Sequence, residues 1–74
     1  MAAKGVDMPV DQELERLLAR SLEQTDALLE RNEVTWETAS RGVEAIALDL
    51  ERRYPERTDW IRAQVADWRR RRAH

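Results

Sequence analysis

Apolar side chains recur at three- and four-residue spacing from Pro9 almost to the end of the chain, with charged residues between them. This periodicity is typical of amphipathic helices, whereas strands alternate apolar and polar residues. Two interruptions, at residues 32–35 and at Pro55, divide the pattern into three runs. The sequence therefore predicts an all-α fold with three helices.

The first helix is expected to begin near residue 9 or 10, because Pro9 suits the first turn, where its missing N–H costs nothing. Ser21, Thr25 and Asn32 interrupt its apolar face. Either the hydroxyls bond back to the preceding turn and allow close helix approach, which we favour, or the polar groups fix the register of a helix–helix interface. The apolar face itself spans an arc of about 140° and contains Val10, Leu14, Leu17, Leu18, Leu22, Leu28 and Leu29.

The second helix carries an apolar stripe close to a seven-residue repeat. The stripe contains Trp36, Ala39, Val43, Ile46, Ala47, Leu50 and Tyr54. Its aromatic members, Trp36 and Tyr54, are expected in the core. Gly42 lies beside the stripe and indicates a close approach by a neighbouring helix, since glycine otherwise weakens a helix interior. Leu48 lies outside the stripe, and we expect it to be a docking point for the third helix.

Cap residues and proline set the remaining boundaries. Thr35 is the expected N-cap of the second helix, and Pro55 ends that helix at or just before the preceding residue. Thr58 followed by Asp59 supplies a cap and a first-turn carboxylate for a third helix over residues 59–72. One face of this helix contains Trp60, Ile61, Gln64, Val65 and Trp68.

Chain length limits the stability of such a fold. A domain of 74 residues buries only about 60% of its unfolded surface. Small domains usually gain extra stability from disulfides, a bound metal or oligomerisation. The chain has no cysteine, and its one histidine is the last residue, so we expect oligomerisation to supply this stability. We expect one small helical domain over residues 1–74, with a disordered leader at 1–8 and a basic tail at 69–74. Its first two helices form an antiparallel hairpin, the third folds back across it, and two copies pair into a dimeric four-helix bundle.

Charge is unevenly distributed along the chain. The net charge is −2, but residues 1–38 carry four basic and nine acidic side chains, whereas residues 39–74 carry nine basic and six acidic ones. The two halves should attract each other, within a chain or between chains. Twelve of the thirteen basic residues are arginine, which is typical of a GC-rich bacterial genome. No apolar run approaches the roughly 18 residues of a membrane span, and the first nine residues lack a secretory apolar stretch, so a cytoplasmic location is expected.

Catalytic chemistry has little support in the sequence. Ser21 and Ser40 have no histidine or lysine nearby to activate them. No histidine follows a glutamate at the spacing of a dinuclear metal site. Glu44 and Glu51 stand one heptad apart, but residues at the edge of a packed stripe are usually solvated or paired with arginine. We expect no enzyme activity, no cofactor and no metal.

A binding surface is the remaining expectation, because tryptophan and arginine are enriched at binding hot spots. The predicted function is a non-catalytic protein–protein interaction module, such as a small regulatory, antitoxin-like inhibitory or accessory subunit, that binds another protein or itself. The residues expected to bind the partner are Leu48, Trp60, Arg62, Trp68 and Arg69.

The arginine run at the end of the chain supports an alternative. Arg69, Arg70, Arg71 and Arg72 could neutralise phosphates of a nucleic acid, with Trp68 stacking on a base. The pI of about 5.4 disfavours this hypothesis. Cations also stabilise a helix C-terminus through its dipole, so a solubilising tail is the favoured interpretation, and an acidic protein surface is a further one.

Overall fold

The computed structural model describes residues 9–72, and the side chains of residues 12–72. It contains three α-helices, α1 (Pro9–Glu30), α2 (Trp36–Arg53) and α3 (Thr58–Arg72), and a 3₁₀ turn, η2 (Pro55–Arg57). The predicted all-α fold and the three helices are confirmed. The predicted leader, residues 1–8, and the last two residues of the predicted tail lie outside the described part of the chain.

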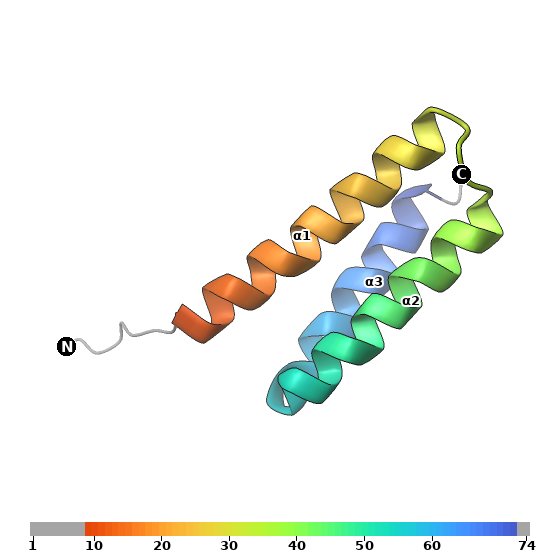
Figure 1. Ribbon diagram of the computed structural model, residues 1–74. Helices are drawn as coiled ribbons and strands as arrows, with labels where there is room; N and C mark the ends of the chain where they lie inside the picture. Colours follow the sequence, from red (N-terminus) through yellow and green to blue (C-terminus); the bar gives the residue numbers. More distant parts are fainter. Residues whose placement is uncertain (1–8, 73–74) are drawn as a thin grey trace.

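The helices form an up–down–up bundle (Figure 1). α1 and α2 make the predicted antiparallel hairpin, and α3 folds back along it in the same direction as α1. The C-terminal ends of α1 and α3 therefore lie at the same end of the molecule as the start of α2. The pairing of two copies into a dimeric bundle stays a prediction.

The connection between α1 and α2 is closed by two caps. Asn32 has φ 59°, in the left-handed region that asparagine tolerates. Its N–H donates to the carbonyl of Leu29, and the N–H of Glu33 donates to Leu28, at 3.1 and 2.9 Å, which is the pattern of a Schellman motif. The Thr35 hydroxyl accepts from the N–H of Thr38 at 3.1 Å, so the predicted N-cap of α2 is confirmed.

The second connection differs from the prediction at one residue. α2 ends at Arg53, as Pro55 predicts. Thr58, however, is not an N-cap, because its backbone is helical (φ −56°, ψ −44°). Its hydroxyl instead donates to the carbonyl of Pro55 at 2.9 Å. The turn that begins at Pro55 runs directly into α3, which leaves no extended residue in which a cap could form.

The core is a single apolar cluster to which all three helices contribute. Its buried members are Leu14, Leu18, Ala39, Val43, Ala47, Leu50, Ile61, Val65 and Trp68. Of the polar residues predicted on the apolar face of α1, Thr25 is satisfied locally, since its hydroxyl donates to the carbonyl of Ser21 at 2.9 Å. Asn32 lies in the turn after Glu30, where α1 ends. The favoured interpretation of that face, a bond back to the preceding turn, is confirmed for Thr25.

Three expectations about α2 were wrong. Trp36 is 39% exposed because it lies in the first turn of α2, at the end of the bundle. Leu48 is 45% exposed and is not the docking point for α3, because α3 packs beside Glu44 and Glu51, on another side of α2. Gly42 marks no close approach either, since a Cβ there would meet nothing within 4 Å. The other aromatic residue of the stripe, Tyr54, is half-buried against the core.

Candidate protein-binding groove between α1 and α3

A groove of about 380 Å³ runs between α1 and α3. Both helices pack extensively on α2 and only weakly on each other. α1 contributes Glu15, Leu18, Ala19, Leu22, Glu23 and Asp26, and α3 contributes Trp60, Gln64, Trp68 and Arg71. The groove combines an apolar floor with charged edges.

The α1 wall follows from the position of its residues around the helix. Leu14 and Leu18 point into the core and are 0% and 2% exposed. At 100° per residue, Leu22 lies at the edge of this apolar face, and Ala19 lies further round, beyond it. Leu22 is half-buried and Ala19 is exposed. The wall is therefore apolar at its base and carries only a methyl group at its middle.

The floor is formed by Trp68, which is 1% exposed. Its indole Nε1–H donates to Oδ1 of Asp26 at 2.8 Å, and its ring stacks on Trp36 with centroids 5.1 Å apart and an angle of 20° between the planes. A buried indole N–H requires such a partner. One side chain thus connects α3 to both α1 and α2, and it fixes the depth of the groove.

The α3 wall begins at Trp60, a half-buried aromatic residue. The guanidinium carbon of Arg57 lies 5.6 Å from the centroid of its ring, within the range of a cation–π contact. Gln64 and Arg71 continue the wall, and Arg71 Nε lies 3.1 Å from Oδ2 of Asp67 on the same helix. This wall is aromatic at one end and close to neutral along its length.

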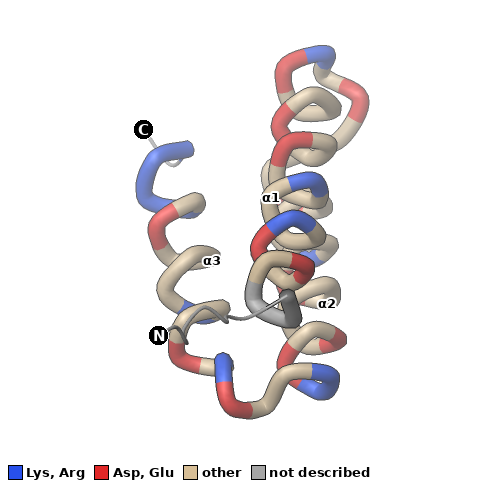
Figure 2. The backbone as a smooth tube through the Cα atoms, turned by 90° about the vertical axis from the view of Figure 1, so that its left-hand side faces the viewer, with Lys and Arg blue, Asp and Glu red and all other residues tan. Residues whose placement is uncertain are grey.

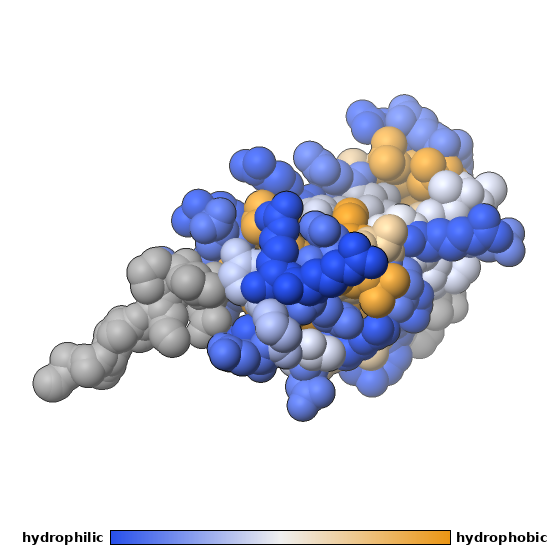
Figure 3. Space-filling model, turned by 60° about the horizontal axis from the view of Figure 1, so that its bottom comes forward, coloured by the Kyte–Doolittle hydropathy of each residue, from blue (hydrophilic) through white to orange (hydrophobic). Residues whose placement is uncertain are grey.

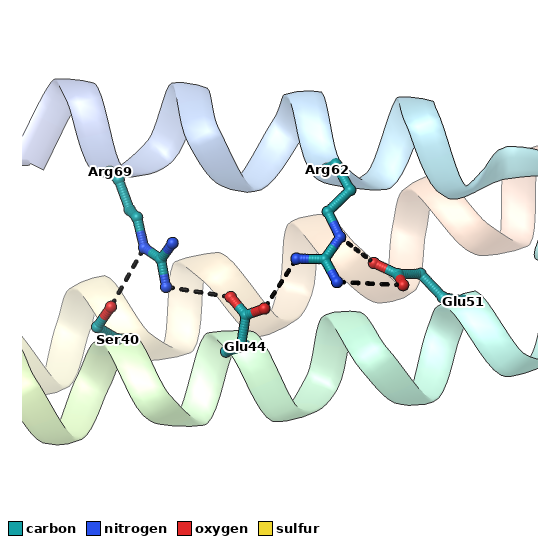
Figure 4. A network of polar contacts seen from close by, with 5 residues as sticks. All are labelled: Ser40, Glu44, Glu51, Arg62 and Arg69. Atoms are coloured by element: carbon teal, nitrogen blue, oxygen red, sulfur yellow. Dashed lines mark hydrogen bonds and ion pairs between the residues drawn. The ribbon is translucent and has the colours of Figure 1, made fainter.

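The opposite side of α3 is fixed to α2 by a polar ladder (Figure 4). Arg62 donates from Nη1 to Oε2 of Glu44 at 2.8 Å, and its Nε lies 2.8 Å from Oε2 of Glu51. Arg69 donates to Glu44 at 3.1 Å and to the Ser40 hydroxyl at 3.2 Å. The hydrogen bond with Glu44, and then the charge of Glu51, raise the pKa of Arg62 above its ordinary value. The ladder sets the register of α3 on α2 and thereby the shape of the groove.

The arginines at the end of α3 are engaged within the chain. Arg70 and Arg71 both pair with Asp67, at 3.3 and 3.1 Å. Figure 2 shows how arginines gather at this end of α3, where the helix dipole favours cations, while α1 carries acidic residues interspersed with basic ones. A nucleic acid would have to compete with these carboxylates for the arginines.

Arg72 joins the two oppositely charged halves. Its guanidinium lies 3.4 Å from Asp26 and 3.7 Å from Glu30, both on α1. The predicted attraction between the acidic front and the basic rear thus operates within one chain in this structure.

The residues predicted to bind a partner fall into three separate places. Trp60 and Trp68 both line the groove, but Trp68 is a buried floor residue rather than an exposed one. Arg62 and Arg69 belong to the ladder between α2 and α3. Leu48 is exposed on α2, away from both sites. The structure therefore brings two of the five residues together and separates the other three from them.

The α1 wall was missed by sequence reasoning. Glu15, Ala19, Glu23 and Asp26 lie beside Leu22 of the predicted apolar face, on a side of the helix that looked solvated. The available indication was Ala19, a small apolar residue beside Leu22 on an otherwise charged face. It does not by itself show which helix lies opposite.

The face of the molecule seen in Figure 3 is mixed in character. In the view of Figure 3, apolar residues form small patches bordered by hydrophilic ones. Over the described residues, none of the helices has the length and apolar character needed to cross a membrane. The same part of the chain contains no cluster of three or more His, Cys, Asp or Glu residues suited to a metal ion.

Comparison with known proteins adds no relative. No family model matches the chain, and neither a curated protein nor a solved structure matches it.

Proposed function

We propose that this protein is a non-catalytic helical interaction module, a small regulatory, inhibitory or accessory subunit, and that it receives an α-helix of a partner protein in the groove between α1 and α3. The observation that carries the proposal is the groove itself, with Leu22, Trp60 and Trp68 at its base and carboxylates along one edge. A helix laid between two helices would complete a four-helix arrangement, a common way to bury an amphipathic helix.

Three properties of the groove support this role. Its α3 wall carries Trp60, a half-buried residue of the type most enriched at binding hot spots, next to the buried ring of Trp68. Its middle is lined by Ala19, whose small side chain allows the backbone of a second helix to come close. Its floor is held by the Trp68–Asp26 hydrogen bond, so the surface is formed before a partner arrives.

The experiment uses the tagged full chain and a nuclease-treated lysate of the source cells. Three proteins are compared: the wild type, Ala19→Arg, and Ala45→Arg as the matched control. An arginine at 19 lies one turn from both Glu15 and Glu23, so it fills the groove while pairing favourably on its own helix. Ala45 is exposed on α2 and does not line the groove, so the same substitution there leaves the groove open.

The expected result is a protein retained in fixed ratio by the wild type and by Ala45→Arg, and retained at least tenfold less by Ala19→Arg. Circular dichroism melts confirm that all three are folded. Equal retention by the two arginine variants would refute the groove as the binding site. Recovery of nucleic acid alone, when nuclease is omitted, would favour the arginine-run hypothesis instead.

A further inference from the structure

The two walls of the groove differ in charge. The α1 wall carries three carboxylates, those of Glu15, Glu23 and Asp26. Asp26 already accepts from Trp68 and pairs with Arg72. Within the described part of the chain, Glu15 and Glu23 form no ion pair or side-chain hydrogen bond. Two carboxylates at the edge of an apolar groove are therefore left for an external cation.

These carboxylates have a regular geometry. Glu15, Ala19 and Glu23 stand at i, i+4 and i+8, which places them in one row along the helix. A rise of 1.5 Å per residue separates the two glutamates by about 12 Å along the axis. The methyl group of Ala19 lies between them, so the row consists of two carboxylates separated by a small side chain that leaves space above it.

The length of the groove limits the occupant. On α1 the lining residues run from Glu15 to Asp26, about 16 Å of helix. An occupant helix that follows the groove needs about three turns, or eleven to twelve residues, to cover it. This length suits a single amphipathic helix.

We infer, on the basis of the proposed function, that the partner offers an amphipathic helix with one basic flank. Lys or Arg residues seven or eight positions apart lie opposite Glu15 and Glu23. A large apolar side chain between them lies over Ala19, and further apolar residues face Leu22 and Trp60. The flank that faces Glu15 and Glu23 is expected to be basic rather than acidic, because like charges that face each other across an interface are unfavourable.

The α3 wall does not offer an acidic helix an equivalent site. The arginine among the lining residues is Arg71, and Asp67 on the same helix already pairs with it. The other lining groups of this wall are the two indoles and the Gln64 amide. The orientation of the occupant is therefore set by α1, with its basic flank on that side.

The probe is a displayed library of 16-residue helical peptides, randomised on one face and selected on the immobilised full chain. Selected peptides are expected to carry Lys or Arg seven or eight positions apart with a large apolar residue between them. The double variant Glu15→Lys/Glu23→Lys should bind those peptides at least tenfold more weakly and should select Asp or Glu instead. The control, Glu13→Lys/Glu37→Lys, changes the net charge equally at two exposed positions outside the groove and should leave both results unchanged.

Each other outcome has a definite meaning. Peptides that lose binding with Ala19→Arg but show no basic pattern would overturn this inference and leave the proposed function standing. Peptides that all bind Ala19→Arg normally would overturn both. Sedimentation showing a dimer of the wild type that Ala19→Arg dissociates would identify a second copy as the occupant, and would also overturn the inference.

Discussion

The indole N–H of Trp68 donates a 2.8 Å hydrogen bond to the carboxylate of Asp26, joining α3 to α1 across 42 positions of sequence. The same ring stacks on Trp36 at the start of α2. The three helices are therefore connected at one side chain, which is also the floor of the groove. Stability and the shape of the binding surface are coupled at this point.

Replacing Trp68 by Phe should lower the free energy of unfolding by about 1–3 kcal/mol, because the smaller ring leaves a gap and Asp26 loses its donor. Urea denaturation followed by circular dichroism measures the change. Trp36→Phe is the comparison, since it keeps an aromatic ring at a side chain that is already 39% exposed. Equal losses in the two variants would show that the hydrogen bond to Asp26 and the burial of Trp68 add nothing.

Gly42→Ala should stabilise the protein by about 0.5–1 kcal/mol, because the position is an exposed helix interior and a new Cβ meets no neighbour. Thermal and urea denaturation both measure this change in the free energy of unfolding. The reverse change at a nearby exposed position, Ala45→Gly, should cost a similar amount. A destabilised Gly42→Ala would indicate that something packs closely on this face after all.

Thr35→Ala should cost about 1 kcal/mol, since it removes the side chain that caps the N–H of Thr38. Thr35→Ser retains the hydroxyl and should remain near the wild type. Helix content at 222 nm and the urea midpoint together separate fraying of α2 from global unfolding. If serine and alanine behave alike, the cap does not contribute.

Arg62→Gln should lower the urea midpoint more than Arg41→Gln. Arg62 bridges Glu44 and Glu51, whereas Arg41 makes one exposed contact with Glu37 at 3.9 Å. The pKa of Arg62 is raised in the folded state, so its contribution is complete below the ordinary guanidinium pKa and is lost only as pH rises through the still higher folded value. The difference between the wild type and Arg62→Gln should therefore be constant from pH 7 to about 10. A difference that shrinks within that range would contradict the assignment.

The sequence predicted the helices well because local rules determine them. The proline at position 9, the Thr35 cap and Pro55 each act on their own segment, and periodicity located most of the core. The exposed ion pairs of Glu37 with Arg41 and of Asp49 with Arg53 are likewise local, since each joins residues one helical turn apart, at 3.9 and 3.5 Å.

Packing between helices was harder to predict. Gly42 and Leu48 each suggested a neighbour, but the direction of α3 after Pro55 is a tertiary property that no local pattern specifies. α3 instead lies over Glu44 and Glu51, which were expected to be solvated or paired with arginine and are paired.

Only one wall of the candidate site could be predicted from the sequence, because the packing of α3 relative to α1 is not specified by any local pattern. Trp60 and Trp68 stood out as large aromatic residues, so their wall was identified. The facing wall of Glu15, Ala19 and Glu23 consists of ordinary helix-surface residues. It lines a groove only because the fold places α3 opposite it.

The most direct test of the groove is a ¹⁵N–¹H NMR titration of the full chain with a peptide selected on it. We expect the indole signal of Trp60 and the amide signals of Ala19 and Gln64 to shift most, and Ala19→Arg to abolish these shifts. Shifts confined to the outer face of α2, around Arg41, Leu48 and Arg52, would contradict a binding site between α1 and α3.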